Sequence, residues 1–386
     1  METKYILNFI KNTAIILVLL LPILLFLFST GEFQSIASAA NKQILEKNNS
    51  IYGVAFRNNT IEYKLQMLSK VNPKIITLGS SRVLQFSKEM FKKDFYNLGN
   101  SMSSINEGFE ISDYIINQNP DIVFFGVDFW WFNENWIIPR PLETKEALLN
   151  NIEKPYSIDI SNIMETIKWI FSGKITLSDI YNQFNSGSSN IGLQGIYGDG
   201  FRSDGQHFSS RTIAGKIPSH DIKFITTTDE VNIGTRYNFS KGINAKHYEN
   251  FLMLVKKISL SGTKVIIFFP PFAPEINTAL INSNKIKFIE ILKNKFIKDN
   301  LSFYDFTNSK KISSSSCEFI DGIHPGIVTN ARLLLKISQN DDKVHKYLDY
   351  EYVKNIVNNN QGLSYLPNNE ISSLPEVDYL AIGCQK

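Results

Sequence analysis

Short apolar runs alternate with helix-forming stretches along most of the chain between residues 72 and 340. Five runs have the length and composition of strands buried in a sheet, at 75–78, 95–98, 122–127, 265–269 and 303–306. Helical periodicity or helix-forming composition is found at 105–117, 248–260, 285–297 and 327–337. Strands that alternate with helices in this way predict an α/β domain of three layers, with helices on both faces of a parallel sheet.

Two long segments break this alternation. Residues from about 130 to 244 begin with a Pro-rich stretch at 138–141 and contain a predicted helix at 161–171 and a glycine-rich run at 186–205. We interpret them as a long insertion over the edge of the sheet. Residues 341–386 become polar, so we expect a C-terminal tail that lies outside the core.

An uncharged segment near the N-terminus gives the strongest physical signal in the chain. Residues 12–31 carry no charged side chain. Their apolar core is long enough to cross a hydrocarbon layer of about 30 Å as a helix. Lys4 and Lys11 precede this segment, whereas Glu32 follows it. The segment is therefore predicted to be a single transmembrane helix. By the positive-inside rule, its N-terminus lies in the cytoplasm and residues 32 onward lie outside the cell membrane.

A cleaved signal peptide is the competing interpretation, because the small residues at 37–39 match the pattern of a cleavage site. We favour an uncleaved anchor, since that site lies well past the end of the apolar run. Both interpretations export the rest of the chain. The expected organisation is an anchor at 1–31, a stalk and entry helix at 32–71, and a catalytic domain at 72–340.

Charge and cysteine content exclude several classes of function. The 386 residues include 40 basic and 37 acidic ones and carry a net charge of +3, so no nucleic-acid-binding surface is predicted. Cys317 and Cys384 are the two cysteines. They can pair in an oxidising compartment, but at 67 positions apart we favour two unrelated thiols. The five histidines are scattered, so we expect neither a metal site nor a cofactor.

Two short motifs far apart in the sequence carry the candidate chemistry. In the first, Gly79, Ser80, Ser81 and Arg82 follow a predicted buried strand. The glycine lets the backbone leave the strand sharply, so that a serine is exposed on a turn. The competing interpretation is an ordinary strand-to-helix turn whose serine caps the next helix. A second Gly-Ser-Ser at 187–189 follows no strand and is interpreted as a loop.

The second motif places an acid close to an imidazole. Asp321 precedes His324 by three residues, just before the last predicted helix of the domain. An aspartate at this spacing on a turn can accept from the ring Nδ1–H and leave Nε2 free to take a hydroxyl proton. Most such spacings are surface decoration. The position of this one at the end of the α/β pattern favours a catalytic role.

With these motifs the chain resembles the SGNH/GDSL hydrolase superfamily, whose fold is flavodoxin-like. The four blocks of that family can be traced in order at 79–81, Gly99, 126–128 and 321–324. The resemblance implies that Ser81 is the nucleophile, His324 the base and Asp321 its orienter. It also implies that the backbone N–H groups of Ser81 and Gly99 form part of an oxyanion hole.

Two positions depart from the family pattern. Ser80 stands where the family has an aspartate, a change also found in membrane-anchored members that act on cell-surface polymers. Asp128 stands where the family supplies an asparagine amide as oxyanion donor. An ionised carboxylate accepts and cannot donate, so Asp128 either points elsewhere or opposes catalysis, and Asn100 is the candidate replacement donor. Arg82 is a candidate ligand for an anionic group of a polymer, with a solvated or core-pairing helix residue as the alternative.

Aromatic and proline-rich segments near the predicted site admit structural or binding roles. Residues 129–132 and Trp136 offer either a sugar-stacking platform or packing under a lid, and we favour packing. The segments 198–205 and 269–274 resemble parts of envelope-polysaccharide modification proteins. The second of them follows a predicted strand and is expected to line the cleft.

The sequence thus predicts a membrane-anchored serine O-acyltransferase that acts outside the cell on a cell-envelope polysaccharide. Acetyl is the favoured acyl group. Ser81 would form an acyl-enzyme that passes its group to a sugar hydroxyl, and a membrane-bound acyltransferase partner would supply the acyl group. Two alternatives stay open: an O-acyl esterase with the same substrates, and a non-catalytic protein of this fold that binds polymer. Asp128 is the feature that supports the second alternative.

Overall fold

The structure is a computed structural model that describes residues 2–46, 50–138, 144–185, 190–234, 236–366 and 375–385. Parts of three predicted segments lie outside these residues, namely the Pro-rich stretch at 138–141, the second Gly-Ser-Ser at 187–189 and part of the C-terminal tail. The helices are α1 (Glu2–Ser29), α2 (Ile36–Leu45), α3 (Thr60–Val71), α4 (Ile105–Asn117), α5 (Lys145–Ile152), α6 (Ile160–Phe171), α7 (Leu177–Asn185), α8 (Gly192–Tyr197), α9 (Ser210–Ile213), α10 (Ile225–Ile233), α11 (Ala245–Leu260), α12 (Pro274–Asn282), α13 (Ile286–Lys298), α14 (Ile327–Ser338), α15 (Asp342–Tyr347) and α16 (Tyr350–Asn359). The strands are β1 (Ile75–Leu78), β2 (Phe95–Leu98), β3 (Ile122–Gly126), β4 (Asp199–Phe201), β5 (His207–Ser209), β6 (Lys264–Phe269) and β7 (Phe303–Asp305).

The chain divides into two compact units. The first consists of Met1–Asn59 and Asn151–Ser203, and the second of Thr60–Asn150 and Asp204–Lys386. The predicted insertion at about 130–244 is therefore shared between the two units. Its central part belongs with the N-terminal residues, and its two ends belong with the sheet.

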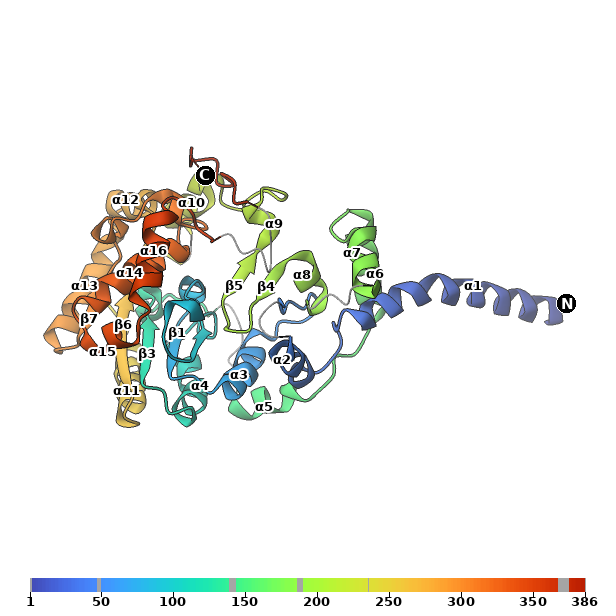
Figure 1. Cartoon of the computed structure of the whole chain (residues 1–386), viewed down its shortest axis with the longest axis horizontal. Coiled ribbons are helices and arrows are strands. Elements are labelled where there is room, and N and C mark those ends of the chain that lie inside the picture. Colours follow the sequence, from blue (N-terminus) through green and yellow to red (C-terminus); the bar gives the residue numbers. More distant parts are fainter. Residues whose placement is uncertain are drawn as a thin grey trace. The chain divides into compact units, whose positions relative to one another are not determined.

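The second unit is a mixed α/β domain built on a parallel sheet of five strands, as predicted. The strand order is β2-β1-β3-β6-β7, and all neighbours run parallel. This order matches a flavodoxin-like fold, in which ligands bind beyond the carboxyl ends of the strands. Strands β1, β3 and β6 lie next to one another in Figure 1.

Side chains alternate between the two faces of the sheet and bury both. Phe124 and Phe268 point to the face that packs against α14, α15 and α16. Phe125 points the other way and contacts Phe251 of α11, and Phe269 contacts Phe296 of α13. Because successive strand residues face opposite sides, the continuous apolar runs supply two separate cores.

The prediction that the chain beyond 341 lies outside the core is wrong for residues 342–359. These residues form α15 and α16, whose Val344, Val353 and Ile356 are buried in the same cluster as the sheet. The expectation of two unrelated thiols is also wrong, because Cys317 and Cys384 form a disulfide. This bond fixes the C-terminal end of the chain to the segment that precedes Asp321.

The first unit contains α1 and has a small apolar cluster of its own. Phe26 and Leu27 at the end of α1 pack with Trp169 of α6. Glu32 is fully buried and accepts hydrogen bonds from backbone N–H groups, among them that of Leu193 at 2.8 Å. The predicted anchor segment is helical within α1. Within the described part of the chain, however, no helix combines the length and the apolar character needed to cross a membrane.

Candidate active site

Ser81, His324 and Asp321 form a hydrogen-bonded chain at the carboxyl edge of the sheet. The Ser81 Oγ lies 2.7 Å from His324 Nε2. On the other side of the ring, His324 Nδ1 lies 2.6 Å from Asp321 Oδ2. The predicted proximity of the two distant motifs is therefore confirmed. This is the geometry in which a base takes a hydroxyl proton while a carboxylate holds its ring in place.

The turn that presents Ser81 depends on two glycines. Gly79 follows β1 with a φ of 154°, and a Cβ there would come within 2.7 Å of the Gly126 carbonyl oxygen. A Cβ on Gly126 would lie 2.3 Å from Val83. The turn after β1 and the end of β3 thus approach too closely for any side chain at either position.

The sequence left two interpretations of the serine turn, a helix-capping serine and an exposed nucleophile, and the structure assigns them to neighbouring residues. The Ser80 Oγ accepts from the Arg82 N–H at 3.2 Å and caps the short 3-10 helix Ser81–Val83. Ser81 instead directs its hydroxyl to His324. The capping serine and the candidate nucleophile are therefore different residues.

Asp321 is buried and strongly hydrogen-bonded. Its Oδ1 accepts from the backbone N–H groups of Ile323 and His324, at 2.9 and 2.8 Å. Burial by itself would raise its pKa, but the charge of His324 and the hydrogen bonds of both histidines, His220 and His324, together hold the pKa of Asp321 well below its usual range. The carboxylate is therefore ionised at neutral pH and available to stabilise an imidazolium.

A second histidine, which the sequence motifs did not indicate, contacts the same carboxylate. His220 Nε2 lies 3.2 Å from Asp321 Oδ2. The next residue, Asp221, is fully buried and accepts from the Gly322 N–H at 2.9 Å and from the Thr227 hydroxyl at 2.6 Å. The segment at 220–221 therefore braces the Asp321 motif across about 100 positions of sequence, a distance at which no local pattern signals contact.

Arg82 is buried and joins four segments of the site. Its Nη1 donates to Asp128 Oδ1 at 3.0 Å, and its Nη2 donates to the carbonyls of Pro270 and Pro271 at 2.7 and 2.9 Å. Its Nε donates to the Ile323 carbonyl at 3.1 Å. All three guanidinium nitrogens are thus engaged within the protein, and the side chain is only 1% exposed.

The prediction that Arg82 contacts an anionic polymer is therefore wrong, and the core-pairing alternative holds. The same contact explains Asp128, which is fully buried and directed at Arg82. Burial raises the pKa of Asp128, whereas the charge of Arg82 opposes that rise. Asp128 is thus a structural partner of Arg82, so its carboxylate no longer argues against catalysis.

Of the two backbone N–H groups predicted to donate to an oxyanion, that of Gly99 already has an acceptor, whereas that of Ser81 does not. The Gly99 N–H donates to Asn97 Oδ1 at 2.7 Å, so the structure does not support its predicted role. Among the described residues, the Ser81 N–H has no hydrogen-bond acceptor. Asn100 follows β2 in a left-handed conformation with φ of 64°, and its role as a replacement donor stays a prediction.

The aromatic residues after β3 are packed rather than presented to solvent, which is the alternative that we favoured from the sequence. Phe129, Trp130, Trp131 and Phe132 are each at most 4% exposed. Trp136 is half-buried and donates from Nε1 to the Ser103 carbonyl at 2.9 Å. These rings cannot serve as an open sugar-stacking surface.

Comparison with known proteins adds no assignment, since no protein-family model and no curated protein matches the chain. The functional interpretation therefore depends on the geometry of the site.

Proposed function

We propose that this chain is a serine-dependent O-acyltransferase of the SGNH type that acts outside the membrane on a cell-envelope polysaccharide. The observation that carries the proposal is the relay from Ser81 through His324 to Asp321, with separations of 2.7 and 2.6 Å. Ser81 attacks the acyl carbonyl of the donor while His324 takes its proton, and the donor's leaving group departs with that proton to give an acyl-enzyme. A sugar hydroxyl then gives its proton to His324 and attacks the acyl-enzyme, and Ser81 takes the proton back as it leaves. The Ser81 N–H is available to the developing oxyanion.

The proposed location follows from the chain's N-terminus. The apolar segment at 12–31 anchors the protein, with residues 32 onward outside the cell. The disulfide between Cys317 and Cys384 supports export, because such bonds persist in oxidising compartments. Soluble thioester donors are absent there, so a membrane-bound acyltransferase partner supplies the acyl group.

An O-acyl esterase is the second candidate. The His324 side chain is 25% exposed, so water can reach the base and replace a sugar hydroxyl as acceptor. The two activities differ only in the acceptor. We favour transfer by the resemblance to membrane-anchored members of the superfamily, which is an argument from fold and motif alone.

Turnover of an aryl acetate by the purified full-length protein tests the proposal. Ser81→Ala should abolish turnover. Ser80→Ala is the matched control, because the neighbouring hydroxyl that it removes contacts the Arg82 N–H and Asp128 and does not take part in the relay. Equal turnover by Ser81→Ala and the parent would favour a non-catalytic polymer-binding protein. Added oligosaccharide acceptors, followed by mass spectrometry, separate the two activities: an acylated sugar identifies a transferase, and free acetate alone identifies an esterase.

A further inference from the structure

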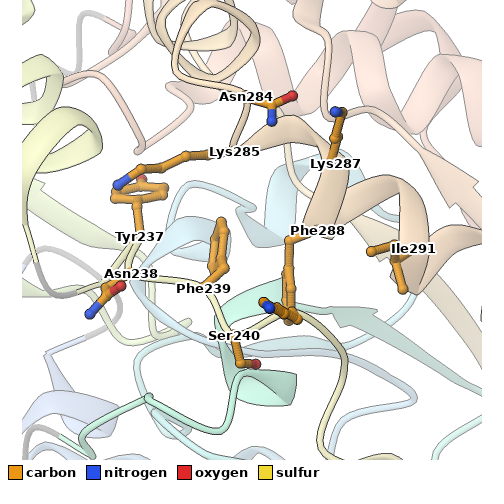
Figure 2. A pocket seen from close by; sticks show the side chains of 10 residues that line it. Tyr237, Asn238, Phe239, Ser240, Asn284, Lys285, Lys287, Phe288 and Ile291 are labelled. Carbon is orange, nitrogen blue, oxygen red and sulfur yellow. The ribbon is translucent and has the colours of Figure 1, made fainter.

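A pocket of about 410 Å³ lies in the second unit (Figure 2), and its described lining includes no residue of the relay. Two segments line it. One runs from Tyr237 to Lys241, and the other comprises Asn284, Lys285, Lys287, Phe288 and Ile291 at the start of α13. Its volume falls within the range of about 300 to 1,000 Å³ that is usual for small-ligand sites.

The pocket is positively charged and has no counter-charge. Lys241, Lys285 and Lys287 line it, and none of the described lining residues is acidic. Within the part of the chain that the structure describes, none of these lysines has a carboxylate partner. The Lys285 Nζ has only a long contact of 3.5 Å to the Asn232 carbonyl, and partial burial lowers its pKa. Three ammonium groups that share no anion favour an anionic ligand.

Apolar rings complete the lining of the pocket. Tyr237 is 1% exposed and its hydroxyl oxygen has almost no accessible surface, so it contributes its ring and not a hydrogen-bonding group. Beside it, the Phe239 and Phe288 rings stack at 4.4 Å and form an apolar wall (Figure 2).

The pocket shares its wall with the aromatic layer around Arg82. The Tyr237 ring lies 6.1 Å from that of Trp130, and the Arg82 guanidinium lies 5.4 Å from the same Trp130 ring. The Phe239 ring lies 5.7 Å from that of Phe129, in the segment that follows β3. The pocket and the Arg82 side chain thus pack against the same aromatic residues of the second unit.

We propose that this lysine pocket binds an anionic sugar unit of the polysaccharide whose acyl group is handled at Ser81, an inference that rests on the proposed function. A carboxylate or phosphate on the sugar pairs with Lys241, Lys285 and Lys287.

Calorimetric binding to the full-length protein tests the proposal. The probes are trigalacturonate, its uncharged trimethyl ester and glucose 6-phosphate. We expect at least one anionic probe to bind and the ester to bind poorly. Replacing Lys285 and Lys287 together by Gln should weaken that binding at least about tenfold. The matched control replaces Lys295 and Lys298 by Gln, in the last turn of the same helix and outside the pocket, and should leave binding unchanged.

The outcomes separate this proposal from the proposed function. Absence of binding by both anionic probes would overturn the pocket assignment, as would equal binding of the ester or equal losses in the two double variants. Which anionic probe binds tells whether carboxylate or phosphate is preferred. Ser81→Ala should abolish aryl acetate turnover and leave trigalacturonate binding intact, whereas the variants of Lys285 and Lys287 should do the reverse. Either proposal can therefore fail while the other stands.

Discussion

Arg82 donates a hydrogen bond of 3.1 Å to the carbonyl of Ile323, the residue directly before His324. The residue that follows the candidate nucleophile thus holds the backbone next to the candidate base. The same guanidinium reaches Asp128 after β3. One buried cation therefore fixes the mutual positions of the loops that carry the relay, which identifies Arg82 as a positioning residue.

Replacing Arg82 by Gln should destabilise the protein by about 3 to 5 kcal/mol, because Asp128 is left buried without its partner. Chemical denaturation measures the free energy of unfolding. The double variant Arg82→Gln with Asp128→Asn should lose less than the sum of the two single variants, since it buries no unpaired charge. A cost below about 0.5 kcal/mol for the single variant, the range of ordinary surface changes, would contradict this account of the site.

Arg82→Lys tests whether Arg82 positions the His324 loop in addition to stabilising the fold. A lysine keeps the charge, but its single ammonium lacks the planar fork that reaches Asp128, Pro270 and Ile323 at once. We expect a folded variant with reduced kcat toward an aryl acetate and a nearly unchanged KM, because the acyl group does not contact residue 82. Full activity of this variant would show that the carbonyl contacts do not set the geometry of His324.

Replacing Asp321 by Asn should lower kcat by roughly 10⁴-fold, by analogy with other Ser-His-Asp relays. The amide can still accept from the Ile323 and His324 N–H groups, but it cannot stabilise a charged imidazole. Steady-state kinetics on an aryl acetate measures the effect. Asp113→Asn, which removes a carboxylate that pairs with Lys257 on the surface, should leave kcat unchanged. Retention of most activity in the Asp321 variant would exclude the relay.

The strands and the triad could be predicted because each depends on a local pattern. Buried parallel strands are continuous apolar runs, and the two motifs lie at loop positions that the α/β order brings to one edge. The partners of Arg82 could not be predicted, because a charged residue after a serine turn looks the same whether it faces solvent or the core. The contact of His220 with Asp321 has no sequence signal at all.

The C-terminal segment shows a different kind of error. Its composition is polar, yet Val353, Ile356 and Val357 recur at the spacing of one helix face and are buried. Mean polarity therefore concealed an amphipathic helix that the periodicity could have revealed. The pairing of Cys317 with Cys384 needed the fold, since two cysteines 67 positions apart give no information about distance.

Breaking this disulfide should lower the free energy of unfolding by about 2 to 4 kcal/mol, because the bond restricts the unfolded chain. Cys384→Ser removes it, and thermal denaturation with and without a reductant measures the effect. The parent should lose stability when reduced, whereas the variant should not respond to the reductant. Equal midpoints for the oxidised parent and the variant would show that the bond contributes little. The kcat of the folded variant toward an aryl acetate should change little, because Cys317 precedes Asp321 without contacting the relay.

Removing His220 should change stability at acidic pH more than at alkaline pH. The contact with Asp321 raises the pKa of His220, while partial burial opposes the rise. A group whose folded pKa is raised stabilises the protein fully below its unfolded value of about 6.5. That stabilisation is lost as the pH rises through the folded value. His220→Gln should therefore lower the thermal midpoint clearly at pH 5.5 and hardly at pH 9.5.

His345→Gln is the control. It removes a histidine of α15 that has no carboxylate contact among the described residues, and its effect on the thermal midpoint should not follow this pH pattern. An equal loss at both pH values in His220→Gln would mean that the ring acts by packing alone and that its charge does not stabilise Asp321.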